Sequence, residues 1–346
     1  MNFTQSKIHE MKSDALLEMA RNFVNDGEIR VYIDDIDRGW TGTKVDIENI
    51  SALLNACRDL ANEDRRLKFR IGLRADAYYL FRTTDASGDK VAGSVIRLDW
   101  DNHQILAVMA KRVANYMGDN VDIDELVRQP QLEISRHLYP VLTERFEAVG
   151  KWSNKPIHNV LLSFVRRRPR DMITLLKTSA VQARKNKHQK ILTPDIQEIL
   201  PSYSESCISD LVIEFSAELE QVEALLTNMR PTKKEMGKPG LKSVYDKGEL
   251  LSKIKNIQQS KNFSFTNRDP VTPQSLANFL YKIDFIIARK EGSDGKIDRK
   301  YFDQNRMLQS QFVDFGYSWE IHPAYRWALQ PYDAKSVLEQ IDALMD

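Results

Sequence analysis

The pattern of apolar and polar positions in the first hundred residues alternates between helical and strand-like segments. Residues 11–25 carry apolar side chains at helical spacing, which predicts a helix. IRVYID (29–34) and FRIGL (69–73) are short apolar runs rich in β-branched residues and followed by charges, which predicts two buried strands. Residues 46–62 between them return to helical spacing. This order predicts a parallel strand pair within an α/β sheet.

The pattern becomes almost wholly helical after the third apolar stretch, VIRL (95–98). Asp99 follows this stretch and is a suitable N-cap for a helix that extends to about Met117. Further helices are predicted near residues 132–148, 156–167, 169–186, 193–200 and 205–229. We therefore expect an α/β segment followed by a mostly α-helical one.

The last third of the chain opens with a polar segment, PTKKEMGKPG (231–240), interrupted by Pro and Gly, which is typical of a linker. Thr272-Pro273 begins a predicted helix that ends at Arg289, and a turn follows at 292–295. Residues 312–329 are rich in aromatic side chains and predict a short strand pair and a final helix. Helices followed by an aromatic hairpin suggest a winged-helix-like C-terminal domain.

Composition changes this picture little. The chain has 346 residues, 50 Lys plus Arg and 49 Asp plus Glu, which is ordinary for a globular protein. Its two cysteines, Cys57 and Cys207, are too few for a disulfide framework, so we expect a reducing, cytoplasmic setting. We expect no membrane segment and no secretory signal, because no sufficiently long apolar run occurs.

The even charge balance hides a strongly basic segment at residues 166–190, where Asp171 is the one acid. Arg166, Arg167 and Arg168 within it are candidates for contacts with a nucleic-acid backbone. A solvated basic surface is an equally good interpretation of the same residues. The C-terminal aromatic residues also permit two interpretations, nucleic-acid binding or the core of a small domain, and the core is favoured because few basic residues lie among them.

Adjacent carboxylates follow the first predicted strand. Asp34 and Asp35 would lie at its carboxyl end, the edge where open α/β sheets bind ligands. In a Mg-nucleotide site, Asp34 would hold the ion through water and Asp35 would polarise the attacking water. A strand followed by an acidic turn explains the same pattern without chemistry. Zinc chemistry is disfavoured because the six His residues stand far apart and no Cys is at metal-binding spacing.

Four segments in order resemble the P-loop ATPases of the AAA+, STAND and KAP kind. IRVYIDDIDRGW resembles their Walker B strand, and FRIGLRADAY, with Arg74, resembles sensor 1. IRLDWDNHQILAVMAKRV resembles the segment that leads into the helical lid, and RRPRDMITLLKTSAVQA, with Arg170, resembles the sensor 2 helix. Bacterial STAND-like ATPases with an Asp-Asp-Leu-Asp-Arg-Gly-Trp type of Walker B are the subgroup that these motifs resemble most.

This resemblance implies an organisation and a set of roles. The organisation is a partial P-loop ATPase core (1–100), a helical lid (101–230), a basic linker (231–264) and a winged-helix-like domain (265–346). Asp35, Arg74 and Arg170 would be catalytic, and Asp34 would bind Mg²⁺ with ATP. The implied function is an ATP-dependent molecular switch, and many members of this subgroup are suspected of roles in anti-phage defence.

The chain departs from that family because it has no Walker A motif, G-x-x-x-x-G-K-[ST]. The segment Gly39 to Val45 comes nearest, but its glycines are three positions apart, and we interpret it as a loop. ATP hydrolysis therefore requires a P-loop supplied upstream or by a partner chain, and a homo-oligomer is also expected. The alternative hypothesis is a catalytically silent module, derived from this scaffold, that binds nucleic acid or protein.

Overall fold

The computed structural model describes residues 27–84, 91–148, 152–232, 235, 243–292, 297–302 and 316–330. The chain divides into two compact units, Met1–Ile96 and Arg97–Asp346. The first is a small α/β unit, and the second is mostly helical with small antiparallel sheets. No helix in these described ranges is long and apolar enough to cross a membrane.

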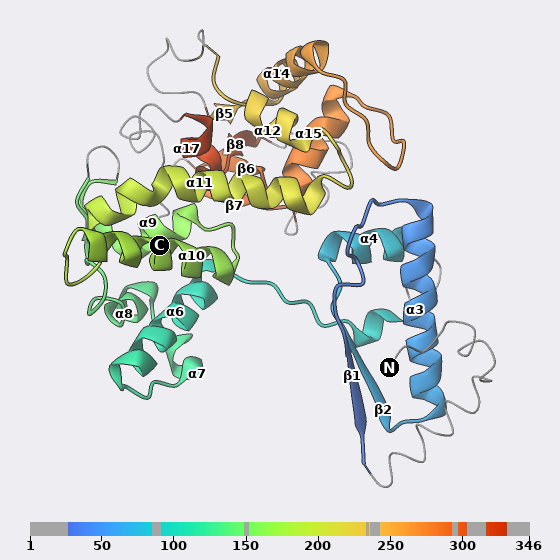
Figure 1. Cartoon of the computed structure of the whole chain (residues 1–346), viewed down its shortest axis with the longest axis horizontal. Coiled ribbons are helices and arrows are strands. Elements are labelled where there is room, and N and C mark those ends of the chain that lie inside the picture. Colours follow the sequence, from blue (N-terminus) through green and yellow to red (C-terminus); the bar gives the residue numbers. More distant parts are fainter. Residues whose placement is uncertain are drawn as a thin grey trace. The chain divides into compact units, whose positions relative to one another are not determined.

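The first unit is built on two parallel strands, β1 (Ile29–Ile33) and β2 (Leu67–Ile71), which pair in register. Helix α3 (Lys44–Glu63) connects them, and α4 (Ala75–Thr84) follows β2 (Figure 1). The strand–helix–strand order is thus confirmed, but the prediction that both strands are buried is wrong, because the described residues of β1 and β2 are half-buried or exposed. A small core of Trp40, Ile50 and Ala77 joins the two helices. The predicted P-loop sheet is not shown, because the described part of this unit has a parallel sheet of two strands.

Two predictions at the edges of this unit have different outcomes. The predicted helix at residues 11–25 lies outside the described residues. The apolar stretch 95–98 follows a short 3₁₀ turn, η1 (Ala92–Ser94), and forms neither helix nor strand. The next helix is capped by Asp101, not by Asp99 as predicted, because the Asp101 carboxylate accepts the Gln104 N–H at 2.7 Å.

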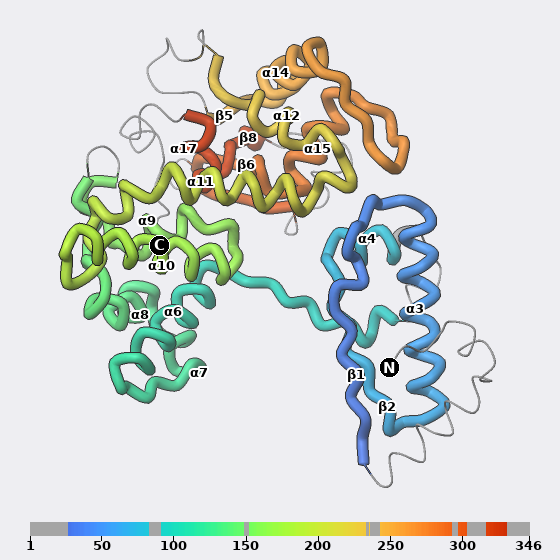
Figure 2. The backbone as a smooth tube through the Cα atoms, in the orientation of Figure 1, coloured from blue at the N-terminus to red at the C-terminus, as the bar shows by residue number. Residues whose placement is uncertain are grey.

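The second unit begins with a group of helices, whose backbone path is traced in Figure 2. The helices are α6 (Asn102–Met117), α7 (Ile123–Leu126), α8 (Gln131–Arg136), α9 (Ile157–Phe164), α10 (Pro169–Lys185), α11 (Thr193–Phe215) and α12 (Val222–Asn228). A two-stranded antiparallel sheet of β3 (Arg145–Phe146) and β4 (Lys155–Pro156) precedes α9. The predicted helices at 156–167 and 169–186 are confirmed.

Four predicted helix boundaries are wrong. The helix predicted from Thr272 to Arg289 ends at Lys282, and a strand begins at Ile286. The segment 132–148 is helical only as far as Arg136, and β3 occupies part of the remainder. The segments 193–200 and 205–229 were separated in the prediction, but α11 runs through Pro201 because the apolar side chains on both sides of this proline stay buried. The same prediction placed one helix as far as residue 229, whereas the chain leaves the helix after Phe215 and α12 begins at Val222.

The last part of the chain adds a four-stranded antiparallel sheet. Its elements are β5 (Val244–Tyr245), α14 (Lys247–Ser260), α15 (Pro273–Lys282), β6 (Ile286–Glu291), β7 (Ile297–Lys300), β8 (Ser318–Ile321), η3 (Pro323–Tyr325) and α17 (Arg326–Leu329). The strand order is β5-β8-β6-β7. The predicted linker 231–264 therefore needs correction, because α14 buries Leu250, Ile254 and Ile257 at helical spacing.

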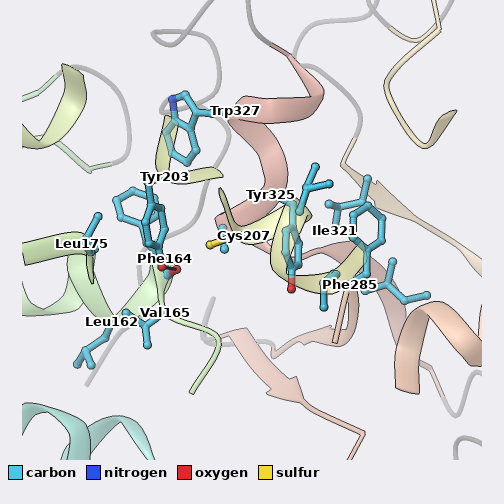
Figure 3. Packing of buried hydrophobic residues seen from close by; sticks show 14 of the residues in the cluster. Leu162, Phe164, Val165, Leu175, Tyr203, Cys207, Phe285, Ile321, Tyr325 and Trp327 are labelled. Carbon is cyan, nitrogen blue, oxygen red and sulfur yellow. Dashed lines mark hydrogen bonds between the residues drawn. The ribbon is translucent and has the colours of Figure 1, made fainter. Parts of the chain in front are cut away.

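One core runs through the whole second unit. Trp152 stacks on Phe164 with ring centroids 4.8 Å apart, and Trp327 meets the same Phe164 edge-on at 5.1 Å. Figure 3 shows Tyr203, Tyr325 and their neighbours in this core. The lid and the C-terminal domain, predicted as separate at 101–230 and 265–346, thus belong to one compact unit. The prediction that the C-terminal aromatics are core residues is confirmed for Trp319, Tyr325 and Trp327, whereas Phe315 lies outside the described residues.

Candidate functional site

Strand β1 delivers two carboxylates at its carboxyl end. The strand ends at Ile33, so Asp34 and Asp35 are the first residues beyond it, and both are exposed. Asp34 Oδ1 accepts the backbone N–H of Asp35 at 3.0 Å. Asp35 adopts a left-handed backbone conformation, with φ of 57°, which turns the chain sharply at this point. The carboxylates therefore lie at the strand edge where parallel α/β sheets bind ligands.

Gly72 lies directly against Asp34. Its N–H continues the β1–β2 pairing by donating to the Ile33 carbonyl at 2.8 Å. A Cβ atom at position 72 would lie 2.7 Å from Asp34 Oδ1, closer than two such atoms can approach. Glycine at this position therefore permits the observed place of the Asp34 carboxylate, a role that the sequence analysis missed. Its only signal was a glycine inside an otherwise apolar run.

Asp37 is a second residue that sequence reasoning missed. Its carboxylate Oδ2 accepts the backbone N–H of Arg74 at 2.7 Å and so ties the loop after β1 to the residues that follow β2. The guanidinium of Arg74 binds Asp76 through two hydrogen bonds of 3.1 and 3.0 Å. The structure thus places Arg74 beside the acidic loop, with its charge paired to Asp76. The sequence did offer one sign of this role, because Asp37 is a third acid two positions after Asp35.

The loop that comes nearest to a P-loop uses its polar groups internally. Thr41 and Thr43 donate their N–H groups to Asp46 Oδ2, each at 3.1 Å, and Asp46 N–H donates back to the Thr43 hydroxyl. Burial alone would raise the pKa of Asp46, but the hydrogen bonds from Thr41 and Thr43 outweigh it and lower that pKa. These amides cap α3 and are not arranged to hold a phosphate, in agreement with the interpretation of this segment as a loop.

The carboxylates do not by themselves form a metal centre. In the parts of the chain that the structure describes, no group of three or more His, Cys, Asp or Glu residues is placed to hold a metal ion.

The remaining predicted residues are all in the second unit. Arg166 is buried, and its guanidinium binds Asp171 through hydrogen bonds of 2.6 and 2.8 Å and Asp210 at 3.0 Å. Burial opposes the charge of Arg166, but the nearby Tyr325 side chain and the hydrogen bond to Asp171 outweigh burial and raise the pKa of Arg166. Arg166 therefore holds the helices together and is not available to a nucleic acid, contrary to the sequence-based hypothesis.

Its neighbours in the basic segment have different surroundings. Arg168 pairs with Glu214 at 3.1 Å, and the Arg167 guanidinium lies 5.1 Å from the centre of the Tyr301 ring. Arg170 is exposed in the first turn of α10, at the position that the sensor 2 resemblance assigned to it. Pro169 suits the first position of this helix, because a backbone N–H there would have no partner within the helix and its absence in proline costs nothing.

Comparison with known proteins finds two similarities. Residues 127–212, which run from just before α8 into α11, match the model of the FunZ-associated C-terminal helical domain. The chain is also 22% identical over 341 residues to the "Putative transposon gamma-delta 80.3 kDa protein" of Escherichia coli (strain K12). That similarity covers 92% of this chain and 43% of the relative, so the chain spans less than half of the relative's length. No solved structure matches.

Proposed function

We propose that this chain is the C-terminal part of a STAND-like P-loop ATPase that acts as an ATP-dependent molecular switch. The observation that carries the proposal is the pairing of β1 with β2, which sets Asp34 against Gly72 and lets Asp37 hold the Arg74 backbone at one carboxyl edge. A Walker B strand beside a sensor 1 strand requires this parallel neighbour relationship. An acidic turn without a function requires neither the second strand nor the close contact with glycine.

Each residue has a distinct role in this proposal. Bound Mg²⁺ would neutralise charge on the phosphates of ATP. Asp34 would hold the ion through water, and Asp35 would orient and polarise the attacking water. Arg74 would act as the sensor of the transferred phosphate after leaving Asp76, with which it pairs in this structure. Arg170, exposed at the start of α10, would report the nucleotide state to the helical second unit.

The phosphate-binding loop must come from outside the described residues. The relative of more than twice the length supports a larger complete protein, because the region similar to this chain is 43% of it. The complete switch would contain a strand followed by a glycine-rich loop and Lys-Ser or Lys-Thr, either upstream of this sequence or on a partner chain. Homo-oligomerisation and a role in anti-phage defence are parts of the proposal that rest on the STAND resemblance.

The C-terminal part is proposed to be a winged-helix-like effector. Its order of elements, α12, β5, α14, α15, β6, β7 and β8, with β8 between β5 and β6 in the sheet, supports this proposal. A winged helix combines helices with a small antiparallel sheet in this manner. Strand β5 and helix α14 would belong to this module. The module would therefore begin before residue 265, the start that the sequence predicted.

The proposal is tested by ATP hydrolysis in the protein that includes the P-loop, as one chain or as a complex. We expect Asp35→Asn to abolish turnover and to leave ATP binding intact, because the water-activating group is lost while the phosphate contacts remain. Asp59→Asn is the matched control, since Asp59 is an exposed carboxylate on α3 that pairs with Arg58 at 2.8 Å.

Two results would count against the proposal. Normal hydrolysis by Asp35→Asn would show that this carboxylate is not the catalytic one. Calorimetry that detects no binding of Mg-ATP to the complete protein would instead favour the silent binding module derived from the same scaffold.

A further inference from the structure

Helices α6 and α10 pack against each other and are almost free of acidic residues. Asp171 is the one acid in either helix, and it is buried in its ion pair with Arg166. The next acid after α6 is Asp119, beyond the glycine that ends this helix. The residues of the two helices therefore carry a net positive charge.

An apolar groove of about 200 Å³ lies on this surface. From α6 it is lined by residues at helical spacing, which place them on one face, and α10 and Val141 complete it. The lining residues are Met109, Arg112, Val113, Tyr116, Val141, Ile173 and Leu176. Tyr116 is 85% exposed, so its ring stands at the mouth of the groove and contributes little to the core.

Basic side chains border this groove. Arg112 is one of its lining residues, and Lys177 and Arg184 follow Ile173 by four and eleven positions, which places them on the same side of α10. All three cations are exposed. Within the described ranges, none of the three forms an ion pair. Lys177 and Arg184 are separated by roughly 10 Å along the helix, at 1.5 Å per residue.

We propose that the α6–α10 groove binds single-stranded nucleic acid. A base would stack on Tyr116 above the apolar groove, and the phosphates would lie along Arg112, Lys177 and Arg184. An exposed aromatic ring beside a row of unpaired cations is the combination that binds unpaired bases and their backbone together. Charge complementarity favours a polyanion, and the stacking ring favours an unpaired strand over a duplex. The inference does not depend on ATP binding.

This surface differs from the one that the sequence suggested. Arg166 and Arg168, within the same basic segment, are engaged with Asp171 and Glu214. The proposed surface uses instead the exposed Lys177 and Arg184 of α10. Arg112 adds a third cation from α6, which lies more than fifty residues earlier in the sequence. Only the packing of α6 against α10 reveals the combined surface.

Fluorescence anisotropy with a labelled single-stranded oligodeoxynucleotide of about 20 nucleotides tests the proposal on the full 346-residue chain. Tyr116→Ala should weaken binding at least about fivefold, as the loss of one stacked base does, whereas Tyr116→Phe should bind normally. Combined Arg112→Gln, Lys177→Gln and Arg184→Gln should lower the slope of log affinity against log salt by about 2.

The matched control replaces three exposed cations elsewhere in the second unit, Lys255, Lys261 and Arg268, by Gln. We expect this variant to retain its affinity and salt slope within about twofold of the parent. Equal loss in both triple variants would overturn the proposal in favour of a general charge effect. Tighter binding of the matched duplex than of the single strand, with no effect of Tyr116→Ala, would overturn it in favour of duplex recognition. Absence of oligonucleotide binding would also overturn it.

Discussion

Asp34 and Gly72 lie in contact across the ends of two parallel strands, and the contact depends on the absence of a side chain at position 72. A Cβ there would lie 2.7 Å from Asp34 Oδ1, while the Gly72 N–H pairs with the Ile33 carbonyl at 2.8 Å. The backbone at position 72 is therefore fixed by the strand pairing. Any added side chain must be accommodated by movement of the Asp34 carboxylate.

The first prediction follows from this contact. Gly72→Ala should reduce ATP turnover of the P-loop-containing protein by roughly tenfold to a hundredfold, because displacement of a positioned group by about 1 Å has this effect. Steady-state phosphate release is the measurement. Gly93→Ala is the control, since a Cβ at Gly93 would meet no atom within 4 Å. Equal activity of the two variants would show that Asp34 does not need its observed position.

The second prediction concerns the buried ion pair of Arg166 and Asp171. Asp171→Asn should lower the free energy of unfolding of the second unit by about 3–5 kcal/mol, because it leaves the Arg166 charge buried without its main partner. Urea denaturation followed by circular dichroism measures this change. Glu214→Gln, which removes the partly exposed partner of Arg168, should cost less than about 1 kcal/mol. Similar losses in both variants would contradict a structural role specific to Arg166.

The third prediction concerns pH. Burial is the largest cause that lowers the pKa of His322, nearby Arg299 adds to it, and the value falls from 6.5 to about 3. The ring stays neutral in the fold and accepts the Ala324 N–H at Nδ1, at 3.1 Å. Because the unfolded chain takes up a proton more readily, stability is complete above pH 6.5 and decreases as the pH falls toward 3.

The resulting loss between pH 7 and pH 5 should be about 2 kcal/mol for the parent chain. Urea denaturation at several pH values measures it. His322→Asn should be less stable at pH 7 but should show less of this pH dependence, since the titrating ring is gone. An unchanged pH profile in the variant would assign the acid sensitivity to other groups.

The fourth prediction concerns the unity of the second compact unit. Trp327 is 2% exposed and packs edge-on against Phe164, although more than 160 residues separate them in the sequence. Trp327→Ala should lower stability by about 3–5 kcal/mol, the usual cost of removing a large aromatic side chain from a core. Hydrogen exchange should show reduced protection in α9 as well as in α17. Loss of protection in α17 alone would indicate two independent domains.

Several features of the fold could be predicted from local sequence pattern. The strands at 29–34 and 69–73 and the helix between them have apolar runs and spacings that match their structure, and Pro169 marks the start of α10. Predictions failed where long-range packing overrides the local signal. The helix through Pro201 persists because its apolar side chains are buried, and α14 forms in a segment whose polar start resembles a linker.

The sequence by itself determined that two carboxylates follow a strand, that Arg74 follows the next one and that residues 166–190 are basic. It did so because strand periodicity and charge are local properties of the chain. Only the tertiary structure decided that Gly72 faces Asp34, that Asp37 holds Arg74, and that Arg166 is buried. In each case the contact is between residues that are distant in sequence, such as Asp37 and Arg74 or Arg166 and Asp210. Strand pairing and burial of the core bring these residues together. The same reason explains why Tyr116 and Ile173 line one groove.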